Sequence, residues 1–406
     1  MIDILDIQES PVLDNRITKI EIHGYNPYAN TNLRNNDEIR IPIQHQDLYI
    51  LPSQSFLYIE GKVTRTDEGK DEVYLDNNCM AFLFDEIRYE LDGVELDQCR
   101  NVGITTSIKN YLSVGSINKN YVENAGWCHD ALKYTTSDKK FFFNFCVPLR
   151  MLLGFCEDYN HIVINARHEL ILIRSRNDLN SLFSGYDKPK VNASNELTKI
   201  QWKIPHITLE EMNKLAILRF VENGNVVTMN YRTWDLYEYP LLQSSTKHTW
   251  AVKASTQLEK SRFIILALQK NRKDQISNQS HIFDHCNISN VRLYLNSESY
   301  PYDNLNIDFD KNNYSLLYLM YSKFKSAYYG LQEDNLLTLN KFKNIAPLIV
   351  TDCSRQVESI KNGTVDIKID FEYKKDIPLN TSAYCLILHD RIIEYSPLIN
   401  IVRKIT

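Results

Sequence analysis

Glycine and proline are scarce in this sequence, and their scarcity excludes several classes of protein. The 406 residues include 12 Gly and 12 Pro, far fewer than a collagen-like or low-complexity chain contains. The glycines also form none of the phosphate-binding or nucleophile motifs GxxxxGK[ST], GxGxxG and GxSxG. We therefore expect a protein that is not an enzyme and that has no cofactor.

The sequence also lacks a large excess of one charge and closely spaced pairs of cysteines. Lys and Arg number 46 against 51 Asp and Glu, a net charge of −5, which does not suit a surface made to hold nucleic acid or anionic lipid. The eight cysteines form no CxxC pair and suit a reducing compartment. The first residues do not resemble a signal peptide, and no apolar run reaches 18 residues. We expect synthesis in the cytosol and no membrane span.

Two short motifs resemble parts of metal or catalytic sites. His281 and His285 are four residues apart, a spacing that binds a metal on a helix. In an extended chain the same residues lie more than ~12 Å apart, so a plain polar loop is favoured and no metal site is assigned. Cys128, His129 and Asp130 are adjacent, but a catalytic triad is a spatial arrangement, and the motif alone assigns no catalytic residue.

Alternation of apolar and polar residues is the dominant pattern in the chain. Ile39, Ile41 and Ile43 alternate with polar or small neighbours, which is typical of a half-buried antiparallel strand. Turn pairs such as Asp92-Gly93 separate several such runs. Further strands are expected at residues 56–63, 81–90, 140–148, 161–164, 169–175, 199–204, 216–222, 248–253, 262–268, 290–295, 345–350, 366–373 and 383–388. Many short strands with little helix predict β-sandwich or barrel domains.

The strand pattern repeats at half the length of the chain. Residues 103–122 and 313–329 carry apolar residues at helical spacing, and each follows a similar strand–turn–strand unit. Aligning Ile87-Arg88 with Val291-Arg292 gives an offset of 204 residues. We infer a duplicated domain, with an arm at 1–15, a first sandwich at 16–180, a linker at 181–198 and a second sandwich at 199–406.

Aromatic residues are abundant, with 25 Tyr and 16 Phe. Tyr and Trp suit strands and sandwich cores, protein interfaces and the ring stacks of sugar-binding sites. For a single tyrosine the core interpretation is favoured, and for the whole set extensive contact between subunits is the second interpretation.

The whole pattern resembles a known family. The opening Leu5-Asp6-Ile7-Gln8-Glu9-Ser10-Pro11-Val12, the runs at 20–27 and 39–43 and the segment at 84–97 are similar to the double jelly-roll major capsid proteins of Polinton/Maverick-type elements and adintovirus-like viruses. The resemblance covers about residues 15–400. It implies an all-β fold of two tandem eight-stranded jelly-roll β-sandwiches, with a short helix in a long loop of each.

The resemblance also implies a structural role with no catalytic residue. Three chains would form a pseudo-hexameric homotrimer, and many trimers an icosahedral virion capsid, with penton or minor capsid proteins as further candidate partners. The chain would be made in the host cytosol, and the nucleus is a candidate place of assembly. The acidic arm, with Asp3, Asp6 and Glu9, gives no basic contact for a genome, so no direct nucleic-acid binding is expected. The candidate subunit interface consists of Tyr231, Trp234, Tyr237, Tyr239, Tyr318, Tyr321 and Tyr328.

Two alternatives stay open at the level of sequence. A carbohydrate-binding or carbohydrate-active β-sandwich would carry an exposed aromatic platform with carboxylates beside it. A domesticated capsid-like host protein would share every feature of the viral one.

Overall fold

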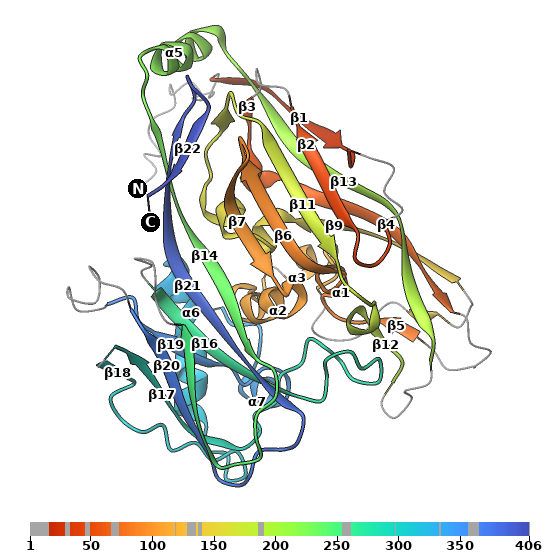
Figure 1. Ribbon diagram of the computed structural model, residues 1–406, viewed down its shortest axis with the longest axis vertical. Coiled ribbons are helices and arrows are strands. Elements are labelled where there is room, and N and C mark those ends of the chain that lie inside the picture. Colours follow the sequence, from red (N-terminus) through yellow and green to blue (C-terminus); the bar gives the residue numbers. More distant parts are fainter. Residues whose placement is uncertain are drawn as a thin grey trace, which may run out of the picture.

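The chain folds into two β-sandwiches, one from each half of the sequence (Figure 1). The structure is a computed structural model and describes residues 16–28, 33–44, 49–65, 73–117, 119–127, 135–136, 140–185, 191–253, 261–296, 298–332, 334–355 and 365–405. The expected arm at 1–15 lies outside the described residues. Within the described part, no helix is long and apolar enough to cross a bilayer.

Eight strands build the first sandwich. They are β1 (Ile17–Tyr25), β2 (Glu38–Ile43), β4 (Phe56–Arg65), β6 (Phe84–Leu91), β7 (Val94–Arg100), β9 (Lys140–Pro148), β11 (His168–Arg174) and β13 (Ala193–Leu209). One sheet runs β1-β13-β4-β9, with the short strands β3 (Tyr49–Ile50) and β10 (Val163–Ile164) beside it. The facing sheet runs β2-β11-β6-β7. A small third sheet joins β5 (Val73–Leu75), β8 (Thr135–Thr136) and β12 (Leu182–Phe183).

The second sandwich has the same connectivity. Its strands are β14 (Val227–Tyr239), β15 (Lys247–Lys253), β16 (Ser261–Lys270), β17 (Ile288–Leu295), β18 (Glu298–Tyr300), β19 (Ile349–Asp352), β20 (Ile367–Tyr373) and β21 (Thr381–Ser396). Its sheets run β14-β21-β16-β19 and β15-β20-β17-β18, and β22 (Ile401–Lys404) is added to β21. In both halves the first, eighth, third and sixth strands form one sheet and the second, seventh, fourth and fifth form the other. The expected pair of eight-stranded jelly rolls is confirmed.

The fourth strands of the two sandwiches show the repeat most directly. β6 begins at Phe84 and β17 at Ile288, which reproduces the offset of 204 residues, and each is eight residues long. Their burial patterns agree at almost every position, because alternate side chains face the core in each.

Each sandwich also carries a helix between its fifth and sixth strands, as expected. These helices are α2 (Val102–Ser113), after β7, and α6 (Ser315–Tyr329), after β18. The helix expected over 103–122 is two helices, because α2 ends at Ser113 and α3 follows at Lys119–Glu123. Besides α5, described below, the other helical elements of the described residues are α1 (Cys79–Phe82), α4 (Gly154–Asp158), α7 (Leu339–Ile345) and the 3₁₀ turns at Pro52–Gln54, Leu149–Met151 and Leu179–Ser181.

The strand expected at 216–222 is a helix, and that prediction is wrong. α5 spans Glu211–Glu222 and connects β13 to β14. Its residues include the good helix formers Met, Leu, Ala, Lys and Arg, and an acidic first turn and a basic last turn complement the helix dipole. A short apolar run does not distinguish strand from helix by its period.

Strand β13 also bears on the division between the halves. It begins at Ala193 and pairs with β4, β3 and β1, so the residues on both sides of the expected boundary at 198/199 belong to the first sandwich. We propose that the division between the two sandwiches lies after Leu209, at α5.

A histidine is buried in the first sandwich at the start of β11. His168 on β11 is 1% exposed, and its Nδ1 lies 2.7 Å from the hydroxyl of Tyr89 on β6. Burial lowers the pKa of His168 to about 3, because a charged imidazole loses its hydration there. The native state therefore holds His168 in its neutral form.

We expect this histidine to make the protein less stable in acid. An unfolded histidine has a pKa of about 6.5, so the stabilising contribution of neutral His168 is complete above that pH and is lost as the pH falls toward about 3. At pH 5 the loss is about 2 kcal/mol. Denaturant unfolding at pH 7 and pH 5 measures it. His168→Gln, which does not titrate, should lose less stability over the same interval, and equal losses in the two proteins would contradict the assignment.

Candidate functional site: the seam between the sandwiches

The two hydrophobic cores exchange side chains where the sandwiches meet. α2 of the first half contributes Ile104, Ile108 and Tyr111 to the core of the second sandwich. In return, Tyr231 of β14 and Tyr395 of β21 pack in the core of the first sandwich. Figure 1 shows α2 where the two sandwiches meet, and β14 and β21 running from one sandwich to the other. α6 of the second half contacts α2. We call this region the seam.

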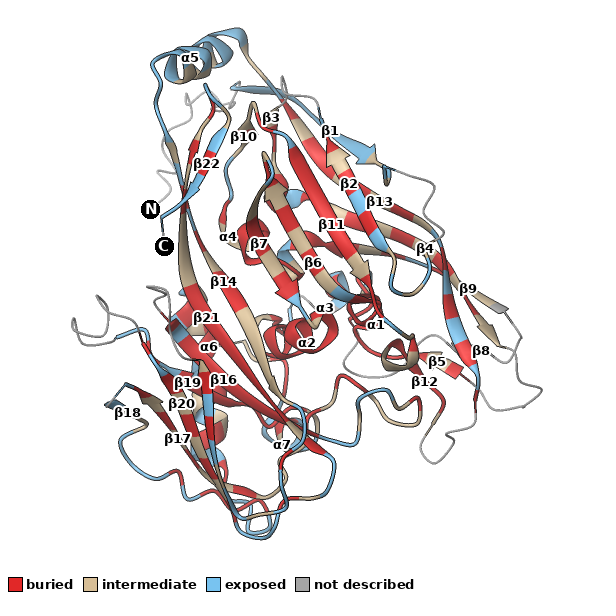
Figure 2. Ribbon diagram, in the orientation of Figure 1, coloured by how far each residue is buried: buried red, intermediate tan, exposed pale blue. Residues whose placement is uncertain are grey.

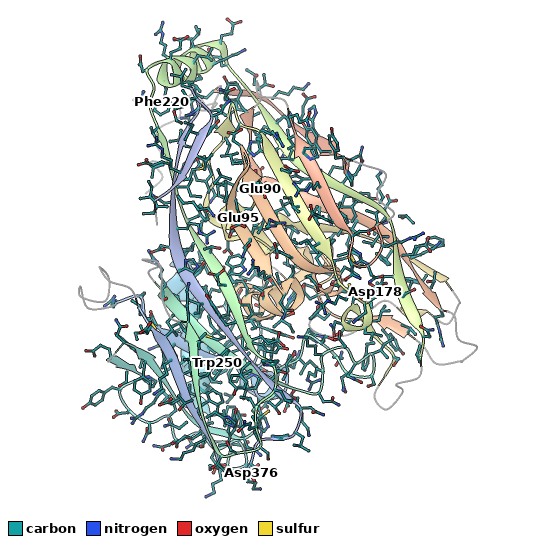
Figure 3. All side chains as sticks on the ribbon, viewed as in Figure 1. Glu90, Glu95, Asp178, Phe220, Trp250 and Asp376 are labelled. Carbon is teal, nitrogen blue, oxygen red and sulfur yellow. The ribbon has the colours of Figure 1, made fainter. Side chains whose placement is uncertain are left out.

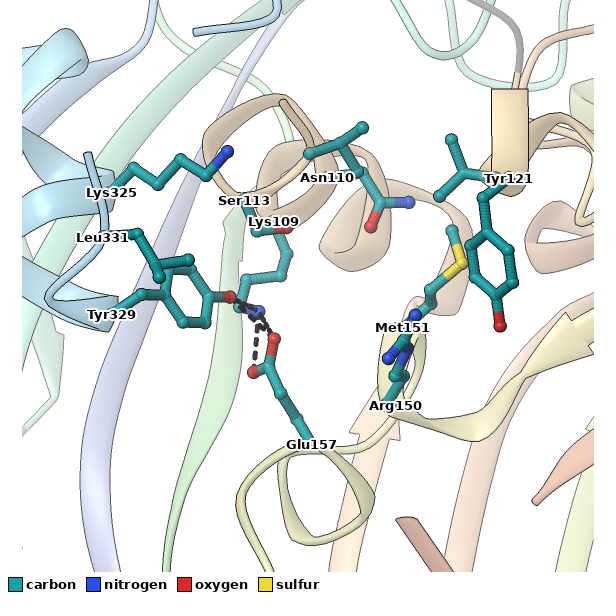
Figure 4. A pocket seen from close by; sticks show the side chains of 12 residues that line it. Lys109, Asn110, Ser113, Tyr121, Arg150, Met151, Glu157, Lys325, Tyr329 and Leu331 are labelled. Carbon is teal, nitrogen blue, oxygen red and sulfur yellow. Dashed lines mark hydrogen bonds and ion pairs between the residues drawn. The ribbon is translucent and has the colours of Figure 1, made fainter. Parts of the chain in front are cut away.

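A buried lysine lies at the centre of the seam. Lys109 on α2 is 2% exposed, and its Nζ donates to both carboxylate oxygens of Glu157, at 2.7 and 2.8 Å, and to the hydroxyl of Tyr329 at 2.7 Å. Tyr329 in turn donates to Glu157 at 2.6 Å (Figure 4). The lysine also lies over the ring of Trp234, 4.5 Å from its centroid. All three ammonium hydrogens therefore have partners, which a buried charge requires.

A second ion pair lies beside the first. Arg232 on β14 donates from Nε and Nη2 to the two oxygens of Asp158, each at 2.7 Å. This two-pronged geometry is the strongest that arginine forms with a carboxylate. The guanidinium carbon lies 3.7 Å from the centroid of the Tyr328 ring. Burial is the largest single influence on Arg232 and opposes its charge. The hydrogen bonds to Asp158 and the nearby charges of Tyr328, Asp158 and Glu157 together outweigh burial and hold the pKa of Arg232 above its ordinary value.

The close approach of α4 to β14 depends on a glycine. A β-carbon on Gly154 would lie 1.9 Å from the carbonyl oxygen of Arg232, so no other residue fits without moving the backbone. The buried carboxylate of Asp97 tightens the same junction, because it accepts from the backbone N–H of Phe155 at 2.9 Å and from the hydroxyl of Thr233. Burial raises the pKa of Asp97.

Two further contacts join the sandwiches through their connecting loops. Buried Asp76 accepts from the backbone N–H of Ser280 at 2.8 Å and lies 3.0 Å from Nδ1 of His281. Asp334 accepts from the hydroxyl of Ser116 at 2.6 Å. Both carboxylates therefore link residues more than 200 positions apart.

In the loop that contains His281 and His285, the contact between His281 and Asp76 is structural. The two histidines are not arranged as a pair of metal ligands. His281 faces Asp76, whereas His285 stacks on Phe309 with ring centroids 4.3 Å apart. Among the described residues there is no group of three or more side chains that could hold a metal ion. The Cys128-His129-Asp130 motif lies outside the described residues.

A cavity of about 270 Å³ opens beside Lys109 (Figure 4). Lys325, one of its basic groups, donates to the backbone and carboxylate oxygens of Asp334. Lys109 and Glu157 on its wall bind each other and Tyr329. These lining groups hold the seam together.

The seven aromatic residues proposed for a subunit interface lie mainly within the chain. Four of them are buried, and the remaining three are partly exposed; the buried four are Tyr231, Trp234, Tyr321 and Tyr328. Tyr321 donates to the carbonyl of Tyr111 at 2.9 Å and so joins α6 to α2. The interface assignment stays a prediction, and Tyr237, Tyr239 and Tyr318 are the members with surface left for a second chain.

The ionic groups of the seam were not found in the sequence. Lys109 lies 48 residues from Glu157, and Arg232 lies 74 residues from Asp158, and nothing in these spacings marks the residues as partners. The available signal was local. Lys109 lies among apolar residues of α2, and every residue from Val102 to Leu112 is buried, so a charge in that helix needed a partner from elsewhere.

Comparisons with known proteins agree with this architecture. The profile of a family described as "Double jelly roll-like domain" matches residues 73–393. The Sputnik virophage structure solved by cryo-EM has a TM-score of 0.66 at 8% identity, covering 98% of this chain and 91% of that chain.

Two further capsid protein structures match over most of the chain. The Faustovirus major capsid protein has a TM-score of 0.58 at 9% identity, covering 96% of this chain and 92% of that one. The mavirus major capsid protein has a TM-score of 0.52 at 11% identity, covering 94% and 89%. The search of curated proteins found no match. At these identities the structures show a shared fold.

We expect Lys109→Met to destabilise the protein by about 3–5 kcal/mol, because it leaves the Glu157 carboxylate without its cation. Denaturant unfolding measures the loss. Lys109→Met combined with Glu157→Leu should recover most of it, since an apolar pair of similar volume replaces a buried ion pair at little cost.

The exposed pair of Lys247 and Glu372, 2.9 Å apart, provides the matched control. Lys247→Met should cost under about 1 kcal/mol. A similar loss for Lys109→Met and Lys247→Met would show that the buried pair does not hold the seam.

Proposed function

Because the chain belongs to the double jelly roll-like domain family, we propose that it is a structural major capsid protein that forms pseudo-hexameric homotrimers and builds an icosahedral shell. One observation carries the proposal: both halves have the same strand order in the same two sheets, so three copies would supply six nearly equivalent sandwiches. The fold shared with virophage, Faustovirus and mavirus proteins over most of the chain supports it.

The seam suits this role. A trimer resembles a hexagon when the two sandwiches of each chain keep a fixed angle. The exchange of core side chains and the ion pairs of Lys109 and Arg232 hold that angle. A loose hinge would allow many tile shapes, and a closed shell needs one repeating geometry.

The expected partners follow from this assignment. The proposed partners are further copies of the chain, first in the trimer and then between trimers in the virion capsid, with penton or minor capsid proteins as additional candidates. The basic cluster at 270–273 does not favour nucleic acid, because Arg272 pairs with Asp284 and Lys273 with Glu238, each at 2.7 Å. We propose no direct contact with a genome.

The carbohydrate-binding alternative has no comparable support. It requires an exposed aromatic platform on one sheet face. Among the residues that the structure describes, the aromatic side chains that are more than half exposed come from four separate segments: Tyr28, Tyr121, Phe142 and Tyr302.

We expect the purified full-length protein to have three times the mass of one chain in mass photometry and to appear as triangular or hexagonal tiles in negative-stain images. Tyr237→Asp, in the proposed interface, should shift the protein toward monomer. Tyr302→Asp, at a side chain that is 90% exposed and outside the proposed set, is the control and should leave the trimer intact. A wild-type protein that stays monomeric at micromolar concentration would overturn the proposal, and glycan binding by that monomer would favour the alternative.

A further inference from the structure

Helix α5 is not covered by any other described part of the chain. None of its twelve residues is buried, and Met212 and Leu215 are 75% and 54% exposed. Figure 2 shows most of the helix coloured as exposed, and Asn213, Ile217 and Val221 are partly covered. A helix of this length is marginal in water unless an apolar face is packed against a partner. The helix therefore lacks the contact that would stabilise it.

The surroundings of α5 are apolar as well. Figure 3 places Phe220 of α5 at the end of the molecule opposite Asp376. Twelve of the 23 large hydrophobic residues that the structure shows as exposed lie on β1, on α5 and the residues after it, and at the β21–β22 hairpin. We call this set the apolar end; it comprises Ile17, Ile20, Ile22, Met212, Leu215, Leu218, Phe220, Val226, Leu398, Ile399, Ile401 and Ile405.

Such a concentration marks a contact surface. A single exposed apolar side chain is ordinary, whereas an apolar cluster at one end of a protein points to a partner. The hairpin belongs to the cluster because β14 begins after α5 with Val227 opposite Tyr395 of β21, which brings the tip of the hairpin next to the connection that follows α5.

The N-terminal segment is attached at this surface. The backbone N–H of Glu210, directly before α5, donates to the carbonyl of Arg16 at 3.0 Å, so residues 1–15 continue from a point beside the first turn of the helix. Seven of the fifteen are large and apolar: Met1, Ile2, Ile4, Leu5, Ile7, Val12 and Leu13.

The lengths are compatible with a contact inside one chain. Fifteen extended residues span up to about 50 Å, and the twelve residues of α5 are about 18 Å long. A segment tethered next to its target acts at an effective concentration in the millimolar range, well above that of a second copy at micromolar protein.

We propose that residues 1–15 dock on α5 of the same chain and cover the apolar end through their isoleucine and leucine side chains. This proposal does not depend on the capsid function, because it concerns one chain in solution.

Cross-linking tests which segment covers the helix. A photoreactive benzoylphenylalanine replaces Leu215 in the protein. Equal amounts of ¹⁴N- and ¹⁵N-labelled protein are mixed in denaturant and refolded together before irradiation, so that any oligomer contains both labels. Cross-links from position 215 to residues 1–15 with the same label on both peptides are the expected result. Cross-links with mixed labels would overturn the proposal in favour of a second copy, and the absence of any cross-link to 1–15 would also overturn it.

Hydrogen exchange tests whether the contact stabilises α5. Changing Leu5 and Ile7 to Asp in the full-length protein should speed exchange of the amides in 211–222 at least about tenfold, with exchange in 102–113 unchanged as proof that the sandwiches stay folded. Ile117→Asp, at another strongly exposed apolar residue, is the matched control and should leave α5 unchanged. Equal α5 exchange in wild type and the Leu5/Ile7 variant would overturn the proposal.

Discussion

The requirement that a buried charge be fully partnered determines how the two halves of this protein fit together. Lys109 lies on α2, a helix that is buried from Val102 to Leu112. Its partners come from α4 of its own half and α6 of the other half. Its ammonium group can be accommodated only when α2, α4, β14 and α6 meet in one arrangement. The ion pair of Arg232 and Asp158 and the close contact at Gly154 fix the same arrangement from the side of β14. The relative placement of the sandwiches therefore depends on these ionic contacts together with the exchange of core side chains.

Much of the fold could be predicted from the sequence, because apolar and polar residues alternate along a strand that has one buried face. The equal length and burial of β6 and β17 show how far this goes. The same reasoning failed at α5, where both sides of the element are exposed and no buried face gives a period to the pattern. It could not find the seam, because the partners of Lys109 lie 48 and 220 residues away along the chain. The local sequence indicates that the lysine needs a partner but does not identify that partner.

Two tyrosines combine packing in a core with hydrogen bonding between the two halves. Tyr321 and Tyr395 use their rings in a core and their hydroxyls to bind backbone carbonyls of the other half, at 2.9 Å for the Tyr111 carbonyl and 2.6 Å for the Asn165 carbonyl. A phenylalanine would fill the same space without satisfying those carbonyls. Many of the abundant aromatic residues therefore make contacts within one chain. Under the proposed role in a shell this internal contact matters first, since subunits can tile regularly only if each has one shape.

The exchange of core residues also has a consequence for synthesis on the ribosome. Ile393, Tyr395 and Val402 belong to the core of the first sandwich, although the strands of that sandwich are complete at Leu209. A nascent chain therefore carries an unfinished first core while nearly 200 further residues are made, which takes on the order of 10–40 s at ordinary translation rates. Duplicated domains usually fold one after the other, but here β21 and β22, which are synthesised after the other strands of the second sandwich, complete the first core. A chain that ended before β21 would contain two incomplete sandwiches.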